Sequence, residues 1–229
     1  MTQEFASIAL RSERWQSDRR FYCGMAWTIG LLVVASFSKA LLRDEFEPGA
    51  LNEPLTQAHA FVFFSWIALF VIQATLIGAR RPDIHRRLGA LGVVIACAMV
   101  VLATLSTIRM FSLGLERFFF ANPHVEVIVF TALISPAFLF RRDAEMHKRL
   151  VLLATIALIG AATAHLPFVS RIPYLYLVLQ DSFIAAGIVY DLVSRRRVHP
   201  AYIWGTLLIL VSQLWVAQQV VQTPMMGRK

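Results

Sequence analysis

Charged residues are scarce in this chain of 229 residues. Asp, Glu, Lys and Arg make up 16% of it and hydrophobic residues 58%, whereas a soluble domain averages about 25% charged and 45–50% apolar residues. The apolar residues also fall in blocks of about 18 to 24, the length at which a helix crosses a hydrocarbon core of roughly 30 Å. The composition therefore excludes an ordinary soluble domain and predicts an integral membrane protein.

Cysteine is nearly absent, and the common catalytic motifs are missing. Cys23 and Cys97 lie inside apolar blocks without CxxC spacing, so the sequence predicts neither a disulfide framework nor a zinc motif. It has no GxSxG, HExxH, Walker or GxGxxG motif. These absences exclude the enzyme classes that such motifs define, and the sequence names no reaction.

The chain also has no basic face, although its net charge is +8. Arg and Lys lie in short connectors between apolar blocks, and no recognised nucleic-acid motif accompanies them. We therefore expect a lipid bilayer as the first partner of this protein, and no nucleic acid.

Seven apolar blocks predict seven transmembrane helices, because only closed backbone hydrogen bonding survives in hydrocarbon. The blocks are 21–42, 57–79, 88–110, 123–140, 150–168, 174–193 and 201–220. The predicted fold is an all-α polytopic membrane helix bundle with a single transmembrane domain at 21–221. A cytoplasmic N-terminal segment at 1–20 precedes this domain, and a short tail at 222–229 follows it.

The orientation follows from the basic residues. Fifteen of the 22 Lys and Arg residues lie in the N-terminal segment and in the connectors 80–87, 141–149 and 195–199. The positive-inside rule then places the N-terminus in the cytoplasm and the C-terminus outside, in the inner (plasma) membrane of a bacterium. We expect Arg86, Arg87, Lys148 and Arg149 to contact anionic lipid headgroups.

One stretch occurs twice, at 80–88 and at 141–150. Each copy has an Arg pair, an acid, a histidine, a second basic pair and a leucine that opens the next apolar block. Spans two and three therefore match spans four and five, and both pairs begin outside, which predicts a parallel internal repeat. We expect spans two to five to form a four-helix core, flanked by one, six and seven. Asp83 and Asp143 are placed to cap spans three and five.

Histidine and one acid carry the candidate chemistry. His59, His124, His165 and Asp181 lie at similar depth near the outer face, where ionisable groups inside a bilayer are functional candidates. Together they could bind a divalent metal such as zinc, copper or iron. The alternative is an interhelical network of ion pairs and hydrogen bonds, for instance between Asp181 and Arg109 or a histidine.

His85 and His147 form the inner layer, one in each copy of the repeated stretch. With His59 and His124 they resemble the four histidines of the two-haem, ascorbate-reducible cytochrome b family. The resemblance implies an outer haem b between His59 and His124, an inner one between His85 and His147, and electron transfer across the bilayer. The alternative for His85 and His147 is a first-turn position beside the capping acids and the headgroups.

The loops with His-Arg/Lys-Arg-Leu after an Arg pair are also similar to those of uncharacterised bacterial multi-spanning membrane proteins. Some small membrane proteins that assist haem–copper oxidase assembly have loops of this kind. Three functions are therefore expected: a haem- or metal-binding redox or assembly role, a non-catalytic accessory subunit of a membrane protein complex, or a small-solute or proton transporter that uses Asp181.

Overall fold

The described part of the chain is all-helical. The computed structural model describes residues 2–43, 53–112, 117–164, 166, 168–169, 172 and 174–222. These residues form seven helices and no strand, which confirms the predicted all-α fold. The helices are α1 (Thr2–Arg43), α2 (Pro54–Gly78), α3 (Pro82–Ser112), α4 (Arg117–Leu139), α5 (Ala144–Ala164), α6 (Leu175–Arg195) and α7 (Pro200–Gln222).

Proline and capping residues set several of the helix starts. Pro54, Pro82 and Pro200 occupy the first positions of α2, α3 and α7, where the missing N–H has no helical partner to lose. Asp143 begins α5 as predicted, because its Oδ1 accepts hydrogen bonds from Glu145 N at 2.9 Å and Met146 N at 3.1 Å. These residues therefore fix where the chain turns between spans.

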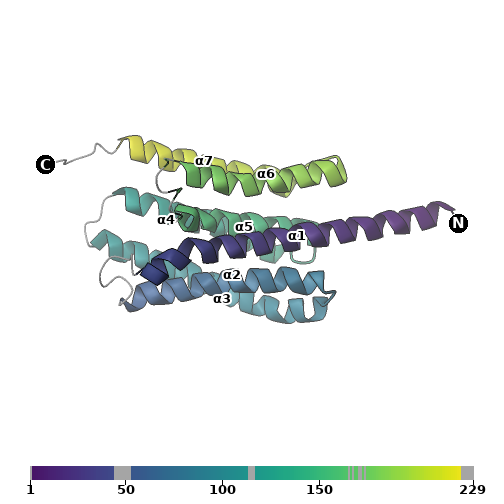
Figure 1. The fold of residues 1–229 in the computed structure, drawn as a ribbon, viewed down its shortest axis with the longest axis horizontal. Coiled ribbons are helices and arrows are strands. Elements are labelled where there is room, and N and C mark those ends of the chain that lie inside the picture. The colour runs from purple at the N-terminus through teal and green to yellow at the C-terminus, as the bar shows by residue number, and fades with distance from the viewer. Residues whose placement is uncertain are drawn as a thin grey trace.

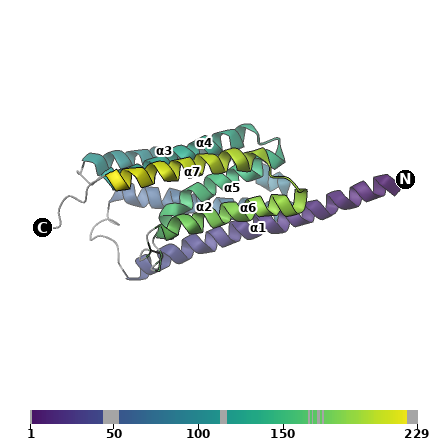
Figure 2. The same ribbon diagram turned by 90° about the horizontal axis from the view of Figure 1, so that it is seen from above.

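The helices run along one common axis, with the N-terminus and the C-terminus at opposite ends (Figures 1 and 2). The connectors after α2, α4 and α6 each carry an Arg pair and lie at the end from which α1 starts. We call this end the basic end. Because α1 is helical from Thr2, the predicted N-terminal segment is part of the first helix.

Five of the described helical segments are long and apolar enough to cross a membrane. They belong to α1, α2, α3, α6 and α7, and the described apolar part of α4 is shorter, at Val125–Leu139. Large apolar side chains on the outside of the bundle, such as Phe61 at 73% exposed and Val94 at 64%, suit contact with lipid. The chain is therefore a multi-pass membrane protein.

The centre of the bundle is α5, which packs against α1, α4, α6 and α7. Nearly every residue from Leu150 to Ile159 is buried. The α2–α3 hairpin lies at one side, where α2 packs on α1 and α3 packs on α4. Spans one, six and seven thus help to form the core, and the expectation that they only flank spans two to five was wrong.

Candidate functional site

Two histidines from different hairpins meet at the basic end of the bundle. His85 lies in the first turn of α3 and His147 in the first turn of α5. Their ring centres are 6.4 Å apart, and the ring planes make an angle of 87°. The structure therefore brings together the two inner histidines that the family resemblance pairs, although they are 62 positions apart in the chain.

Each of these rings is held by a backbone carbonyl of the preceding helix. His85 Nδ1 lies 3.4 Å from Gln73 O on α2, and His147 Nδ1 lies 2.7 Å from Ala137 O on α4. The Gln73 side chain returns the contact by donating to His85 O at 3.2 Å. With Nδ1 protonated to donate to the carbonyl, the Nε2 lone pair is left to accept or to bind a metal.

The surroundings leave Nε2 unused in both rings. No described residue forms a hydrogen bond with Nε2 of His85 or of His147. Gly89 lies one turn after His85 on the same side of α3, and a Cβ placed there would have no atom within 4 Å. The inner pair therefore combines two oriented imidazoles with open space next to one of them.

The outer residues are only partly described. The side chain of His124 and the whole of His165 lie outside the described residues. His59 on α2 has a buried Nδ1 without a hydrogen-bond partner. Among the described side chains, no group of three His, Cys, Asp or Glu residues could hold a metal ion, and the predicted outer metal site stays a prediction.

Asp181 belongs to a hydrogen-bond network of a different kind from the one suggested by the sequence. Its Oδ1 accepts a hydrogen bond from Gln213 Nε2 at 3.0 Å, whereas Arg109 donates to Glu53 Oε1 at 3.1 Å. The structure therefore shows other partners than the example pairing of Asp181 with Arg109: Asp181 contacts Gln213 on α7, and Arg109 contacts Glu53.

A buried ion pair at the basic end joins α5 to α6, and the sequence analysis missed it. The side chains of Arg149 and Asp191 are both 0% exposed, and Arg149 Nε donates to Asp191 Oδ2 at 2.9 Å. Arg149 Nη1 also reaches Glu145 Oε2 at 2.7 Å. Arg149 therefore does not contact lipid headgroups as expected, because its charge is neutralised inside the bundle.

The same network continues to the first helix. Asp18 on α1 accepts from Lys148 Nζ at 2.6 Å and from Arg195 Nη2 at 2.7 Å. Arg195 Nη2 also reaches Glu145 Oε2 at 3.0 Å. The Lys148 ammonium group thus binds mainly protein carboxylates, whereas Arg86 and Arg87 are exposed. Alternating charges from three helices fix how α1, α5 and α6 pack at this end.

Asp83 and His199 have local roles at the basic end. Asp83 lies inside the first turn of α3, where Arg81 Nε and Nη2 each donate to it at 3.3 Å. His199 precedes α7, and its Nδ1 accepts a hydrogen bond from Ala201 N at 3.2 Å. Its backbone N–H donates to Asp191 Oδ2 at 3.1 Å, and burial lowers the pKa of the His199 imidazole. His199 therefore caps α7 rather than joining the inner pair.

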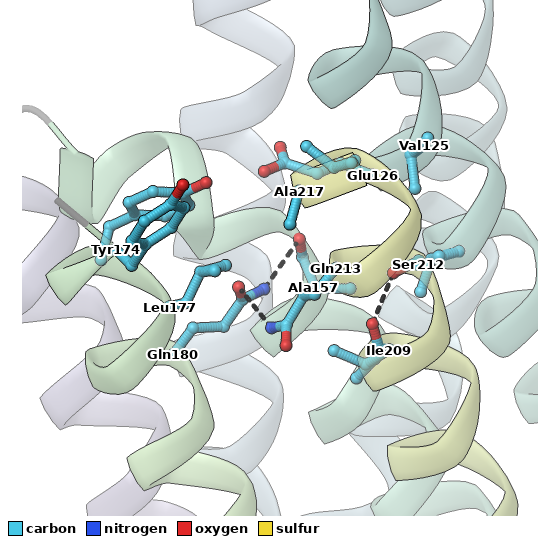
Figure 3. A pocket seen from close by; sticks show the side chains of 13 residues that line it. Val125, Glu126, Ala157, Tyr174, Leu177, Gln180, Ile209, Ser212, Gln213 and Ala217 are labelled. Atoms are coloured by element: carbon cyan, nitrogen blue, oxygen red, sulfur yellow. Dashed lines mark hydrogen bonds between the residues drawn. The ribbon is translucent and has the colours of Figure 1, made fainter. Parts of the chain in front are cut away.

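A cavity of about 260 Å³ lies toward the other end of the bundle, between α4, α5, α6 and α7 (Figure 3). Most of its wall is aliphatic. The polar residues that line it are Glu126, Tyr174, Tyr176, Gln180, Ser212 and Gln213.

Two glutamines fix the polar wall of this cavity. Gln180 Nε2 donates to Ile156 O at 2.9 Å and to Ala157 O at 3.3 Å. Gln213 Nε2 donates to Gln180 Oε1 at 3.2 Å and to Asp181 Oδ1. Figure 3 shows the amides of Gln180 and Gln213 facing each other and the carboxylate of Glu126 above them.

Sequence reasoning had a usable signal for the two acids that it underrated. Asp191 lies inside the sixth apolar block and Glu126 inside the fourth, and an acid within a span needs a partner or a function. The sequence could not show which of the many Arg residues would be that partner for Asp191. It also could not show that Glu126 faces a cavity.

Comparisons with known proteins give no relative from which to transfer a function. No protein-family model, curated protein or solved structure matches the chain at a significant level. Helical membrane bundles host many unrelated functions, so the function has to be argued from the sites themselves.

Proposed function

We propose that this protein is a haem-binding membrane redox protein in which His85 and His147 are the axial ligands of a b-type haem at the basic end. The observation that carries the proposal is the meeting of these two imidazoles from separate hairpins, with ring centres 6.4 Å apart. Two rings that both bond one metal at about 2 Å have their centres roughly 6 Å apart, so the observed spacing suits a shared metal.

The number of ligands favours haem over a metal ion held by the protein alone. A structural zinc site takes four protein ligands and a catalytic one three, and the described side chains offer no such group. Haem iron needs only axial ligands from the protein, because the porphyrin supplies the other four. A pair of imidazoles is therefore a sufficient protein contribution for haem and an insufficient one for zinc.

The tautomer of each histidine also suits this role. A ligating imidazole normally donates its second ring N–H to a carbonyl or carboxylate, which fixes the ring orientation and raises its basicity. The carbonyls of Gln73 and Ala137 are the acceptors here, at 3.4 and 2.7 Å from Nδ1. The open space beside Gly89 lies next to His85 and can take the edge of a flat ring.

A second haem site would complete the family resemblance. His59 lies about 28 Å from the end of α2 at Gly78, at 1.5 Å per residue, and His85 is only one turn into α3. The two histidines therefore lie at different depths in the bundle. The buried Nδ1 of His59 has no hydrogen-bond partner among the described residues, which leaves this ring available to another ligand. We propose His124 as the partner of His59. Haem at two depths would supply one-electron transfer between the two faces of the membrane.

We also propose that the two hairpins form a parallel internal repeat and that the basic end of the protein faces the cytoplasm. The α2–α3 and α4–α5 hairpins present their histidines at the same end and hold them in the same way, which supports a parallel internal repeat. The excess of Arg and Lys at this end supports a cytoplasmic location in a bacterial inner membrane.

An absorption spectrum tests the proposal. The protein is purified in detergent, titrated with haemin, and recorded before and after reduction with dithionite. We expect a Soret band and sharp reduced bands in the wild type, and the loss of the inner site in His85→Ala and His147→Ala. His199→Ala is the matched control, because His199 lies at the same end and its Nδ1 already accepts a hydrogen bond from Ala201 N.

The accessory-subunit alternative predicts the opposite result. If His85 and His147 only cross-link the two hairpins, folded wild-type protein binds no haem in stoichiometric amount. In that case the histidine variants differ from the wild type in thermal stability alone. A colourless, correctly folded preparation after haemin titration would remove the proposal.

A further inference from the structure

We propose that the cavity between α4, α5, α6 and α7 is a binding site for a small organic ammonium ion, that is, a protonated amine with an apolar body. The site lies far from the inner histidine pair, and the proposal does not depend on haem. It follows from the hydrogen-bonding capacity that the described lining residues leave unused.

The hydrogen-bond donors of the amide wall are already used inside the protein. Both N–H bonds of Gln180 go to the α5 carbonyls of Ile156 and Ala157, and both N–H bonds of Gln213 go to Gln180 Oε1 and Asp181. Ser212 Oγ donates to the carbonyl of its own helix, Ile209 O, at 2.6 Å. Apart from the tyrosine hydroxyls, the polar wall therefore presents acceptors only.

Glu126 adds a carboxyl group to this acceptor surface. Among the described lining residues it is the only acid, and none of them is Lys, Arg or His. No described residue donates a hydrogen bond to its carboxylate. Ionising an unpaired carboxyl group in an apolar interior is costly, so a ligand with a positive charge and N–H donors would stabilise the ionised form of Glu126.

The backbone of α5 is shaped to hold this carboxylate. A Cβ at position 160 would lie 2.7 Å from Glu126 Oε1 and 3.3 Å from Gln180 Oε1. A residue larger than glycine at position 160 would therefore require the Glu126 carboxyl group to move.

The rest of the lining suits the apolar part of such a ligand. Tyr174 and Tyr176 at the start of α6 add aromatic rings, and a cation over a tyrosine ring gains attraction from the ring quadrupole. Aliphatic residues from α4 and α7, such as Val129 and Ile209, cover the remainder. An anionic ligand would be repelled by ionised Glu126, and a neutral ligand would bring no charge to stabilise the ionised form.

Calorimetric titration of the purified protein tests the proposal with three probes of similar shape: benzylammonium, benzyl alcohol and phenylacetate. We expect saturable binding of benzylammonium and none of phenylacetate, with benzyl alcohol weaker by roughly tenfold or more, as for a lost hydrogen bond to a charged group. Equal binding of the ammonium and the alcohol, or no binding of benzylammonium, overturns the proposal without any variant.

Variants then assign the site. Glu126→Gln should weaken benzylammonium binding by roughly tenfold or more, and Gly160→Ala should weaken it as well because the added methyl group displaces the carboxylate. Asp83→Asn is the matched control, since that acid is exposed at the basic end, and its binding should equal that of the wild type. Unchanged binding in Glu126→Gln would show that the cavity is not the site.

Discussion

The buried Arg149–Asp191 pair allows the sharpest prediction about stability. Replacing Asp191 with Asn leaves the Arg149 guanidinium, which is 0% exposed, without its bidentate carboxylate partner. Breaking a buried ion pair from one side costs about 3–5 kcal/mol. Glu145 Oε2 stays 2.7 Å from Arg149 and neutralises part of the charge, so we expect a loss of about 3 kcal/mol, at the lower end of that range.

The assay is unfolding of the purified protein in mixed detergent micelles, followed by helical circular dichroism. Asp83→Asn is the control, because Asp83 and Arg81 are both more than half exposed and such an exposed pair contributes little to stability. Replacing Arg149 and Asp191 together, by Met and Leu, should recover most of the loss, since no unpaired charge remains. Equal losses for Asp191→Asn and Asp83→Asn would refute the reasoning.

Three further predictions concern single sites. Gly187→Ala should lower the free energy of unfolding by about 1–3 kcal/mol, because the added Cβ would lie 2.6 Å from Tyr202 Cε1. Gly24→Ala is the control, because a Cβ there meets no atom within 4 Å and should not cause this loss. Thermal unfolding of both variants measures the difference. Asp143→Ala should cost about 1 kcal/mol through loss of the α5 cap, measured by the same unfolding assay, and no change would mean that the cap is dispensable. Burial lowers the pKa of His199 from its ordinary value of 6.5, so the contribution of neutral His199 to stability is present above pH 6.5 and is lost as the pH falls through the lower folded-state pKa. The unfolding midpoint of His199→Asn should therefore depend less on pH than that of the wild type. Parallel curves for the two proteins would contradict this role.

The helices could be predicted from the sequence because the bilayer imposes their length. Each of the seven apolar blocks matches a helix, although α2 and α3 start at Pro54 and Pro82, before the predicted starts at 57 and 88. His85 and His147 lie in two similar stretches of sequence, and the structure places them near each other at the basic end. The sequence suggested this pair only through the resemblance to the two-haem cytochrome b family.

The packing of the helices could not be predicted, because lipid tails are as apolar as leucine side chains and the sequence does not say which face meets which. The α3 and α5 segments are both apolar, yet Val94 is 64% exposed and Leu153 is 0% exposed. For the same reason Arg149 looked like a headgroup contact: its partner Asp191 lies 42 positions further along the chain. The sequence does not give the rotation of each helix about its own axis.

The most direct test of the account is electron paramagnetic resonance of the oxidised, haem-loaded protein. Two axial imidazoles give a six-coordinate, low-spin ferric signal, and we predict this signal in the wild type and in His199→Ala. Removing one ligand of the inner pair, as in His147→Ala, should convert the corresponding part of the signal to high spin. A wild-type protein that takes up no haem, or a low-spin signal unchanged in His85→Ala and His147→Ala, would contradict the account.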